Sequence, residues 1–248
     1  MLRSVIEFQG NAVHGTDEEN VGTIYEFYFH DNRWAIRYLV VDTGNWLSGR
    51  RVLISPVAIS RVEGETQMLF ANLTRTQIEQ SPNIDTDLPI SRQRELEYLQ
   101  YYGWPNQWGM DPTVATAYPK AVSQVGLESA LDPANAPQGD PHLRRTREVI
   151  GYYIHAKDGD IGHVEDFLVD DETWDIRYMV IDTRNWWPGK KILVAPSWIT
   201  EIRWTESKVY VDLSREQIKN GPEFDPTALS RQYEEQLYKH YDRPRYWE

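Results

Sequence analysis

The sequence of 248 residues contains no cysteine. Disulfide bonds, thiolate nucleophiles and cysteine-based zinc sites are therefore excluded. It also lacks any apolar run that approaches the roughly 20 residues of a membrane-spanning helix. The amino-terminal segment has no apolar signal-peptide core, because Glu7 and Gln9 interrupt it. We therefore expect a soluble cytoplasmic protein without an integral membrane segment.

Basic residues are outnumbered: the chain has 26 Lys and Arg against 38 Asp and Glu, and a formal net charge of −12. An acidic chain is repelled by nucleic-acid phosphates and by anionic membrane surfaces. The basic clusters in the sequence are short pairs such as Arg50-Arg51 and Lys190-Lys191. We therefore expect no nucleic acid among the partners.

Sequence motifs of catalytic and metal sites are also missing. There is no Gly-x-Ser-x-Gly, no phosphate-binding glycine-rich loop and no His-Glu-x-x-His. A metal site needs three or more converging ligands, and the acidic stretch around His163 lacks the spacing of a calcium loop. The sequence predicts no catalytic residue, no metal site and no cofactor.

What the sequence does contain is an internal duplication. Residues 20–60 align with residues 160–200 without a gap, and roughly 40% of the positions are identical, far above chance. With 40% hydrophobic and 12% aromatic residues, the chain has enough apolar material for packed cores. Matched pairs include Gly22 with Gly162, Phe27 with Phe167, Arg37 with Arg177, Asp42 with Asp182, and Trp46 with Trp186.

The duplication divides the chain into two domains and a linker. We predict repeat 1 over residues 1–109, a linker rich in proline and alanine over residues 110–146, and repeat 2 over residues 147–248. Each repeat has about 100 residues, enough to bury a core of its own. A linker of this length does not fix how the two domains are arranged.

The strongest secondary-structure pattern is a hairpin in each repeat. Residues 21–31 and 34–41, and their matches 161–171 and 174–181, are rich in β-branched and aromatic residues, which is typical of strands. The polar residues between them predict short turns. Further strands are predicted over 52–54, 57–62 and 68–73, with Pro56 and Pro196 at a strand start or edge.

Helices follow the strands in both repeats. Thr74 and Ser214 each have a glutamine three residues later, which predicts a capping box at the start of a short helix. A second helix is predicted over residues 91–102 and 230–241. The fold class is therefore mainly β with carboxyl-terminal helices in each repeat: two small barrels of about six strands, related by a pseudo-twofold duplication.

The hairpin sequences resemble those of a known family. The pattern Val/Ile-Gly-x-Ile/Val-x-Glu/Asp-Phe, then Trp-x-Ile-Arg-Tyr, then Gly-Arg/Lys-Arg/Lys-Val/Ile-Leu is similar to the PRC-barrel domain. That family includes the cytoplasmic part of the photosynthetic reaction-centre H subunit and the carboxyl-terminal domain of a ribosome-maturation factor. The resemblance implies two PRC-type barrels in a stand-alone bacterial protein. Its motif consists of core and turn residues, which specify a fold rather than a function.

Two matched arginines are candidate interaction residues. Arg37 and Arg177 occupy equal strand positions among apolar neighbours. They either contact an anion or a partner, or pair structurally with Asp42 and Asp182 or with an acidic hairpin residue. We favour the structural role, because both copies keep the arginine. The two aspartates are interpreted as turn-forming residues rather than metal ligands.

Gly22 and Gly162 are interpreted as structural residues in the same way, because both copies keep them. Three loop tryptophans, Trp46, Trp186 and Trp187, are further candidate interaction residues. Exposed tryptophans often anchor interfaces. The alternative is that they pack against a helix of the same domain or against the other domain.

These patterns favour a non-enzymatic scaffold or adaptor that binds a protein partner, with packing between the repeats and a possible homodimer. One alternative is a small-ligand binder or enzyme that uses a cleft between the barrels. Another is an electrostatic accessory to a membrane complex of the photosynthetic type.

Overall fold

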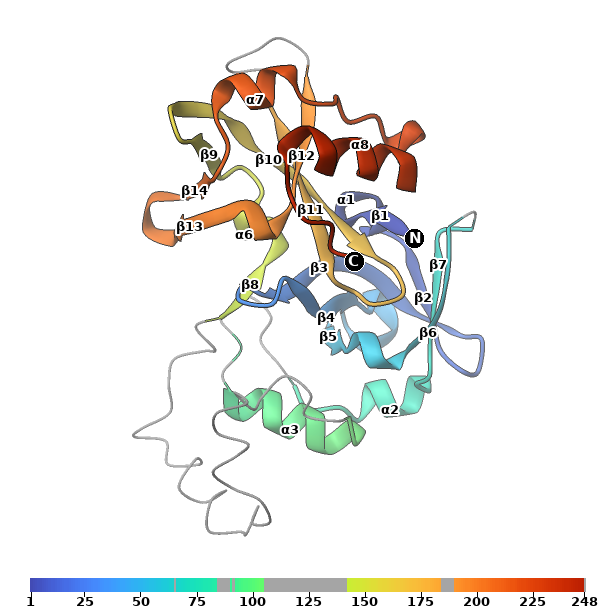
Figure 1. Cartoon of the computed structure of the whole chain (residues 1–248). Coiled ribbons are helices and arrows are strands. Elements are labelled where there is room, and N and C mark those ends of the chain that lie inside the picture. The colour runs from blue at the N-terminus through green and yellow to red at the C-terminus, as the bar shows by residue number, and fades with distance from the viewer. Residues whose placement is uncertain (65, 84–89, 91, 105–141, 184–189, 248) are drawn as a thin grey trace, which may run out of the picture. The chain divides into compact units, whose positions relative to one another are not determined.

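The computed structural model describes the chain except residues 65, 84–89, 91, 105–141, 184–189 and 248 (Figure 1). The chain forms two compact units. The first comprises Met1–Gly10, Glu26–Arg37 and Arg144–Glu248, and the second comprises Asn11–Tyr25 and Tyr38–Leu143. The first ten residues and the turn of the first hairpin therefore belong to the same unit as repeat 2.

The sheet of repeat 1 has the strand order β5-β4-β3-β2-β7-β6. The pairs β2–β3, β4–β5 and β6–β7 are antiparallel, and β2 and β7 run parallel. The strands are β2 (Ala12–His14), β3 (Asn20–His30), β4 (Ala35–Asp42), β5 (Arg51–Ile54), β6 (Ile59–Glu63) and β7 (Met68–Ala71).

The sheet of repeat 2 has the matching order β12-β11-β10-β9-β14-β13, again with one parallel pair, β9 and β14. Among the described residues, no pairing between the two end strands closes either sheet. The strands are β9 (Tyr153–Ala156), β10 (Gly159–Asp170), β11 (Ile176–Asp182), β12 (Lys191–Val194), β13 (Ile199–Arg203) and β14 (Lys208–Val211). The mainly β fold of two matched repeats is confirmed, with six strands along each sheet.

A seventh strand joins each sheet from the other repeat. Strand β1 (Leu2–Ser4) pairs antiparallel with β10, and β8 (Leu143–Arg145) pairs with β3. Each is followed by one short helix, α1 (Val5–Phe8) or α6 (Thr146–Val149). We call the segment β1–α1 the first head and the segment β8–α6 the second head. The predicted linker, 110–146, lies outside the described residues up to residue 141, and its last residues belong to the second head.

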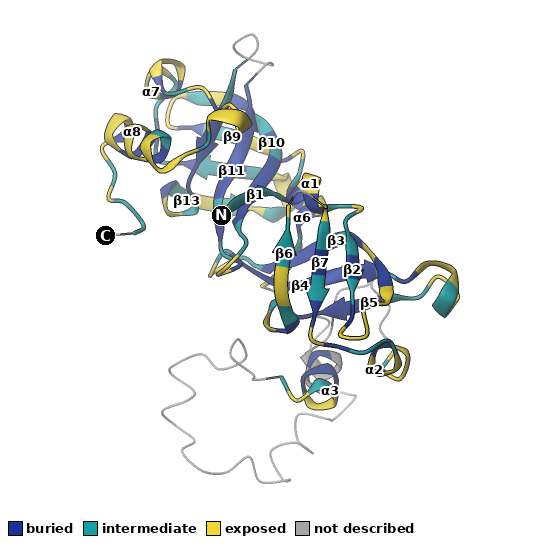
Figure 2. Cartoon of the chain, turned by 90° about the vertical axis from the view of Figure 1, so that its right-hand side faces the viewer, coloured by how far each residue is buried: buried dark blue, intermediate teal, exposed yellow. Residues whose placement is uncertain are grey.

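The core of each repeat lies along its long hairpin. Residues 35–41 of β4 are all buried, as are most residues of β11, so these strands are covered on both faces. Figure 2 shows β4, β10 and β11 as mostly buried. A strand covered on both faces has a nearly continuous apolar sequence, which explains why repeats 1 and 2 are most alike here.

The helices agree with the sequence predictions. The capping boxes at Thr74 and Ser214 are both formed, at the starts of α2 (Arg75–Glu79) and α7 (Arg215–Asn220). The longer helices are α3 (Arg92–Tyr102) and α8 (Arg231–Tyr241). The 3-10 helices are η1 (Gly44–Leu47), η2 (Pro56–Ala58), η3 (Pro196–Trp198), η4 (Trp204–Glu206) and η5 (Pro226–Ala228).

Two local predictions were wrong. Trp34 and Trp174, predicted to begin strands, lie just before the strands and have positive φ angles of 54° and 61°. Pro56 and Pro196 begin the 3-10 helices η2 and η3, not strands. The first position of a helix suits proline because the N–H group there has no partner within the helix.

Candidate functional site

The turns of the two long hairpins meet within the first unit. The Ile36 N–H donates to the Trp174 carbonyl at 2.8 Å, and the Ile176 N–H donates to the Trp34 carbonyl at 2.6 Å. Both tryptophans follow polar turns and adopt left-handed backbone conformations, which reverse the chain just before each strand begins. These reciprocal bonds bring residues from both repeats to one place.

A surface groove of about 450 Å³ lies beside this meeting point, and we call it the hairpin groove. It combines aromatic, aliphatic and polar side chains from four segments that are distant in the sequence. Its lining residues are Asn32, Arg33, Trp34, Asp175, Ile176, Arg177, Ala195, Pro196, Ser197, Tyr238 and Tyr246.

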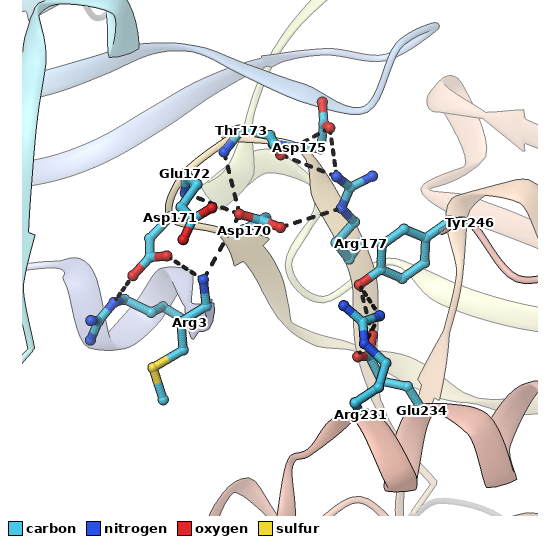
Figure 3. Close-up of polar contacts among 11 residues, drawn as sticks. Arg3, Asp170, Asp171, Glu172, Thr173, Asp175, Arg177, Arg231, Glu234 and Tyr246 are labelled. Atoms are coloured by element: carbon cyan, nitrogen blue, oxygen red, sulfur yellow. Dashed lines mark hydrogen bonds and ion pairs between the residues drawn. The ribbon is translucent and has the colours of Figure 1, made fainter. Parts of the chain in front are cut away.

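Arg177 is held in the hairpin groove by its own repeat (Figure 3). Its guanidinium lies 2.9 Å from a carboxylate oxygen of Asp175 and 3.9 Å from one of Asp170. It also donates to the Thr173 hydroxyl at 3.1 Å and lies 4.4 Å from the ring centre of Tyr246. Of the two structural pairings considered from the sequence, the one with acidic hairpin residues is therefore formed. Arg37, its match, is only 2% exposed.

The carboxyl-terminal tail forms one side of the hairpin groove. The buried Glu234 of α8 accepts hydrogen bonds from the hydroxyls of Tyr178 at 2.8 Å and Tyr246 at 2.9 Å. Arg231 lies 3.1 Å from the same carboxylate (Figure 3). Its guanidinium also stacks on the Trp247 ring at 4.2 Å. These contacts fix the tail on α8 and place the Tyr246 ring over Arg177.

Sequence reasoning missed the buried tyrosine–glutamate pair, although the repeat contains a signal for it. In repeat 1, the Tyr38 hydroxyl donates to Glu95 of α3 at 2.7 Å, as Tyr178 does to Glu234 in repeat 2. Burial raises the pKa of Tyr178, with Tyr238 and Glu234 adding to the increase. The phenol therefore stays protonated and remains a hydrogen-bond donor.

An acid-sensitive ion pair anchors the start of the tail. Asp212, just after β14, lies 2.6 Å from Lys157 and 2.6 Å from Arg243. Hydrogen bonds from these two cations lower the pKa of Asp212 to about 2. The folded-state pKa thus lies below the ordinary aspartate value of about 3.9. The ion pairs of Asp212 therefore stabilise the fold fully above the ordinary aspartate pKa. This stabilisation is lost as the pH falls through about 2.

We therefore expect acidification to loosen the tail. The indole N–H resonance of Trp247 should move toward its unfolded position as the pH is lowered from 5 to about 2, because protonated Asp212 no longer attracts Arg243. The variant Asp212→Asn is the control, since its side chain does not titrate. An identical pH dependence in the variant would contradict the assignment.

The two matched glycines lie where the backbone approaches itself closely, and Asp42 forms a turn. A Cβ atom on Gly22 would lie 2.3 Å from the Asp42 carbonyl oxygen, and one on Gly162 would lie 2.0 Å from that of Asp182. Asp42 accepts a hydrogen bond from the Gly44 N–H at 2.9 Å, which is the predicted Asx turn.

Trp46 is half-buried in the second unit. Its indole N–H donates to the Val21 carbonyl at 3.1 Å, and the Arg75 guanidinium lies 4.2 Å from the ring centre. The tryptophan thus packs within its own unit and leaves part of its ring accessible. Trp186 and Trp187 lie outside the described residues.

In the described part of the chain, no three His, Asp or Glu side chains are grouped so that they could hold a metal ion. None of its helices is long and apolar enough to cross a membrane. His155 contacts the carboxylate of Asp160 at 2.7 Å.

These features define a class of protein: a duplicated, mainly β module in which each sheet receives one strand from the other repeat. The family model of the PRC-barrel domain matches residues 4–76 and 142–218. The chain belongs to the PRC-barrel domain family. The second matched region contains the whole second head, and the first begins at Ser4, the last residue of β1.

The chain is also similar to an uncharacterized protein of Deinococcus radiodurans, with 31% identity over 104 residues. The match covers 37% of this chain and 37% of the relative, so it spans less than two thirds of that protein's length.

Proposed function

We propose that this protein is a non-enzymatic interaction module and that the hairpin groove binds a protein partner. The observation that carries the proposal is the composition of the groove. Trp34, Tyr246 and Pro196 supply apolar surface, and Asn32 and Arg33 supply exposed polar groups at its edge. Aromatic residues and arginine are the residue types that most often dominate the binding energy of protein interfaces.

The ionisable groups around the groove support binding rather than catalysis. Arg177 is engaged by two carboxylates and a tyrosine ring, and Glu234 is buried and accepts hydrogen bonds from two tyrosines. A general acid or base needs access to its substrate and a proton that it can exchange. These groups instead fix the shape of the surface, so the groove offers a preformed recognition site. The ligand-binding and membrane-accessory alternatives stay predictions.

Blocking the groove is expected to abolish partner capture. Ser197 is exposed and lines the groove, so the substitution Ser197→Arg introduces a long cation without removing a packed side chain. We expect immobilised full-length Ser197→Arg to recover its partner from extracts of the native host at least about tenfold less than wild type, a loss of roughly 1.4 kcal/mol. Quantitative mass spectrometry measures the recovery.

Gln236→Arg is the matched control. Gln236 is exposed on α8 and does not line the groove, and its substitution changes the charge by the same amount. A partner that binds the groove is retained by wild type and Gln236→Arg and lost from Ser197→Arg. Equal recovery by both variants, with unchanged circular dichroism, would show that the groove is not the binding surface.

A further inference from the structure

The first head occupies a strand-shaped site on repeat 2. Leu2 pairs with Asp170, Arg3 with Val169, and Ser4 with Leu168 along the edge of β10. All these residues belong to the first unit. Backbone pairing of this kind binds any extended segment, so the side chains must supply the specificity.

Polar side chains fix the register of the first head. The Arg3 guanidinium donates to Asp171 at 2.5 Å (Figure 3). The partly buried Asp166 accepts a hydrogen bond from the Ser4 hydroxyl and another, at 3.2 Å, from the Ile6 N–H. Asp166 therefore binds the start of α1, while Asp171 binds the guanidinium at the other end of the pairing.

Apolar packing completes the site. Phe8 of the first head is 2% exposed, and its ring centre lies 5.8 Å from that of Trp174 and 5.9 Å from that of Phe27. Val5 is fully buried. The head is thus bound by a short ladder, two carboxylates and an aromatic cluster.

The second head repeats this arrangement on repeat 1. Arg144 lies 3.5 Å from Asp31, as Arg3 lies beside Asp171. Thr146 donates to the Phe27 carbonyl at 3.4 Å, and both Thr146 and Val149 are fully buried. The chain therefore contains two matched heads and two matched sites, and each head binds the site of the other repeat.

A short exposed connection joins each head to its own repeat. Gly10 and Gly151 have φ angles of +85° and +96°, and no atom lies within 4 Å of a Cβ built on either glycine. The backbone can change direction there without displacing packed side chains.

We propose that the edge of β10 also binds the first head of a second copy of this chain, so that two copies exchange first heads and form a closed dimer. The site would make the same contacts with either head, because the two sequences are identical. The chain that binds its own first head is favoured when the effective concentration of that head exceeds the protein concentration. The exchanged dimer is favoured as the protein concentration rises. This surface differs from the hairpin groove, so the two proposals are tested separately.

Cysteine cross-linking tests the exchange directly, because the chain has no cysteine of its own. Directly opposite residues of an antiparallel pair have Cα atoms about 4.5–5.5 Å apart, within the usual range of a disulfide. Full-length Leu2→Cys and full-length Asp170→Cys are mixed, unfolded in urea, refolded together at about 1 or 100 µM and oxidised. We expect a disulfide-linked heterodimer that increases severalfold with concentration, as a bimolecular exchange requires.

Three controls decide the outcome. The double variant Leu2→Cys/Asp170→Cys should form the disulfide within one chain at low concentration. Glu172→Cys, exposed in the turn and not opposite Leu2, should give little heterodimer with Leu2→Cys. Adding Arg3→Glu to Leu2→Cys should lower the heterodimer yield, because Asp171 then faces a negative charge.

If either single variant fails to refold, Ser4→Cys with Leu168→Cys tests the same pairing.

Peptide mass spectrometry identifies the linked residues, and a disulfide between residues 2 and 170 of different chains supports the proposal. The proposal is overturned if the heterodimer yield is no higher than with Glu172→Cys, or if Arg3→Glu does not change that yield. It is also overturned if the double variant forms its disulfide within one chain at every concentration while the mixed single variants form no heterodimer.

Discussion

Replacing Gly162 with alanine should lower the free energy of unfolding by about 3–5 kcal/mol, because overpacking and backbone strain each cost about 1–3 kcal/mol. The added Cβ would lie 2.0 Å from the carbonyl oxygen of Asp182 and 3.0 Å from the Cα of Thr183. These are backbone atoms, so they cannot rotate away. The φ angle of +151° is also unfavourable for alanine. Urea denaturation measures the effect. The slope of the unfolding free energy against urea concentration should stay the same as in the wild type.

Gly151→Ala separates the two causes. Gly151 also has a positive φ angle, +96°, but a Cβ there would meet no atom within 4 Å. Its substitution should therefore cost only the backbone strain, about 1–2 kcal/mol. Equal losses for the two variants would mean that the close approach of β10 to the end of β11 does not require glycine.

Glu234→Ala should lower the free energy of unfolding by about 2–4 kcal/mol, since each buried donor left without an acceptor costs about 1–3 kcal/mol. Glu234 is 4% exposed and accepts hydrogen bonds from Tyr178 and Tyr246. Its removal leaves the buried Tyr178 hydroxyl unsatisfied and detaches Tyr246 from α8. Thermal and urea unfolding measure the loss, and increased hydrogen exchange at residues 243–247 reports release of the tail.

Glu235→Ala is the control for this variant. Glu235 is exposed on the same helix, so its substitution removes the same side chain without a buried partner. We expect a change within about 0.5 kcal/mol of wild type. If the two variants are equally stable, the tyrosine–glutamate pair does not join α8 to the sheet.

Several residues that recur in both repeats make the same structural contact in each. Gly22 and Gly162 allow the same close approach, and Tyr38–Glu95 and Tyr178–Glu234 make the same buried contact. The tyrosine–glutamate contacts join segments that are distant in the sequence and were not predicted. The hairpins, the capping boxes and the long helices were predicted, because strand periodicity and helix capping depend on residues only a few positions apart.

The hairpin groove was harder to predict. The sequence singled out Arg177, which lies in the groove, and left its pairing with hairpin carboxylates open as one of two structural roles. It did not indicate that Asn32, Pro196 and Tyr246 line the same groove, because these residues come from segments that only the fold brings together. The tryptophan loops at Trp46 and Trp186 were chosen because exposed aromatic residues favour interfaces, and their role stays a prediction.

The sequence by itself determined that this protein is duplicated, mainly β and a member of a fold family built from core and turn residues. Tertiary structure alone decided that each head pairs with the other repeat. The two heads have similar sequences, and β3 and β10 offer them equivalent edges with an aspartate near one end, Asp31 or Asp171. Local sequence therefore fits either pairing equally well. The choice depends on contacts between segments more than a hundred residues apart, such as Arg3 with Asp171, which form only in the folded chain.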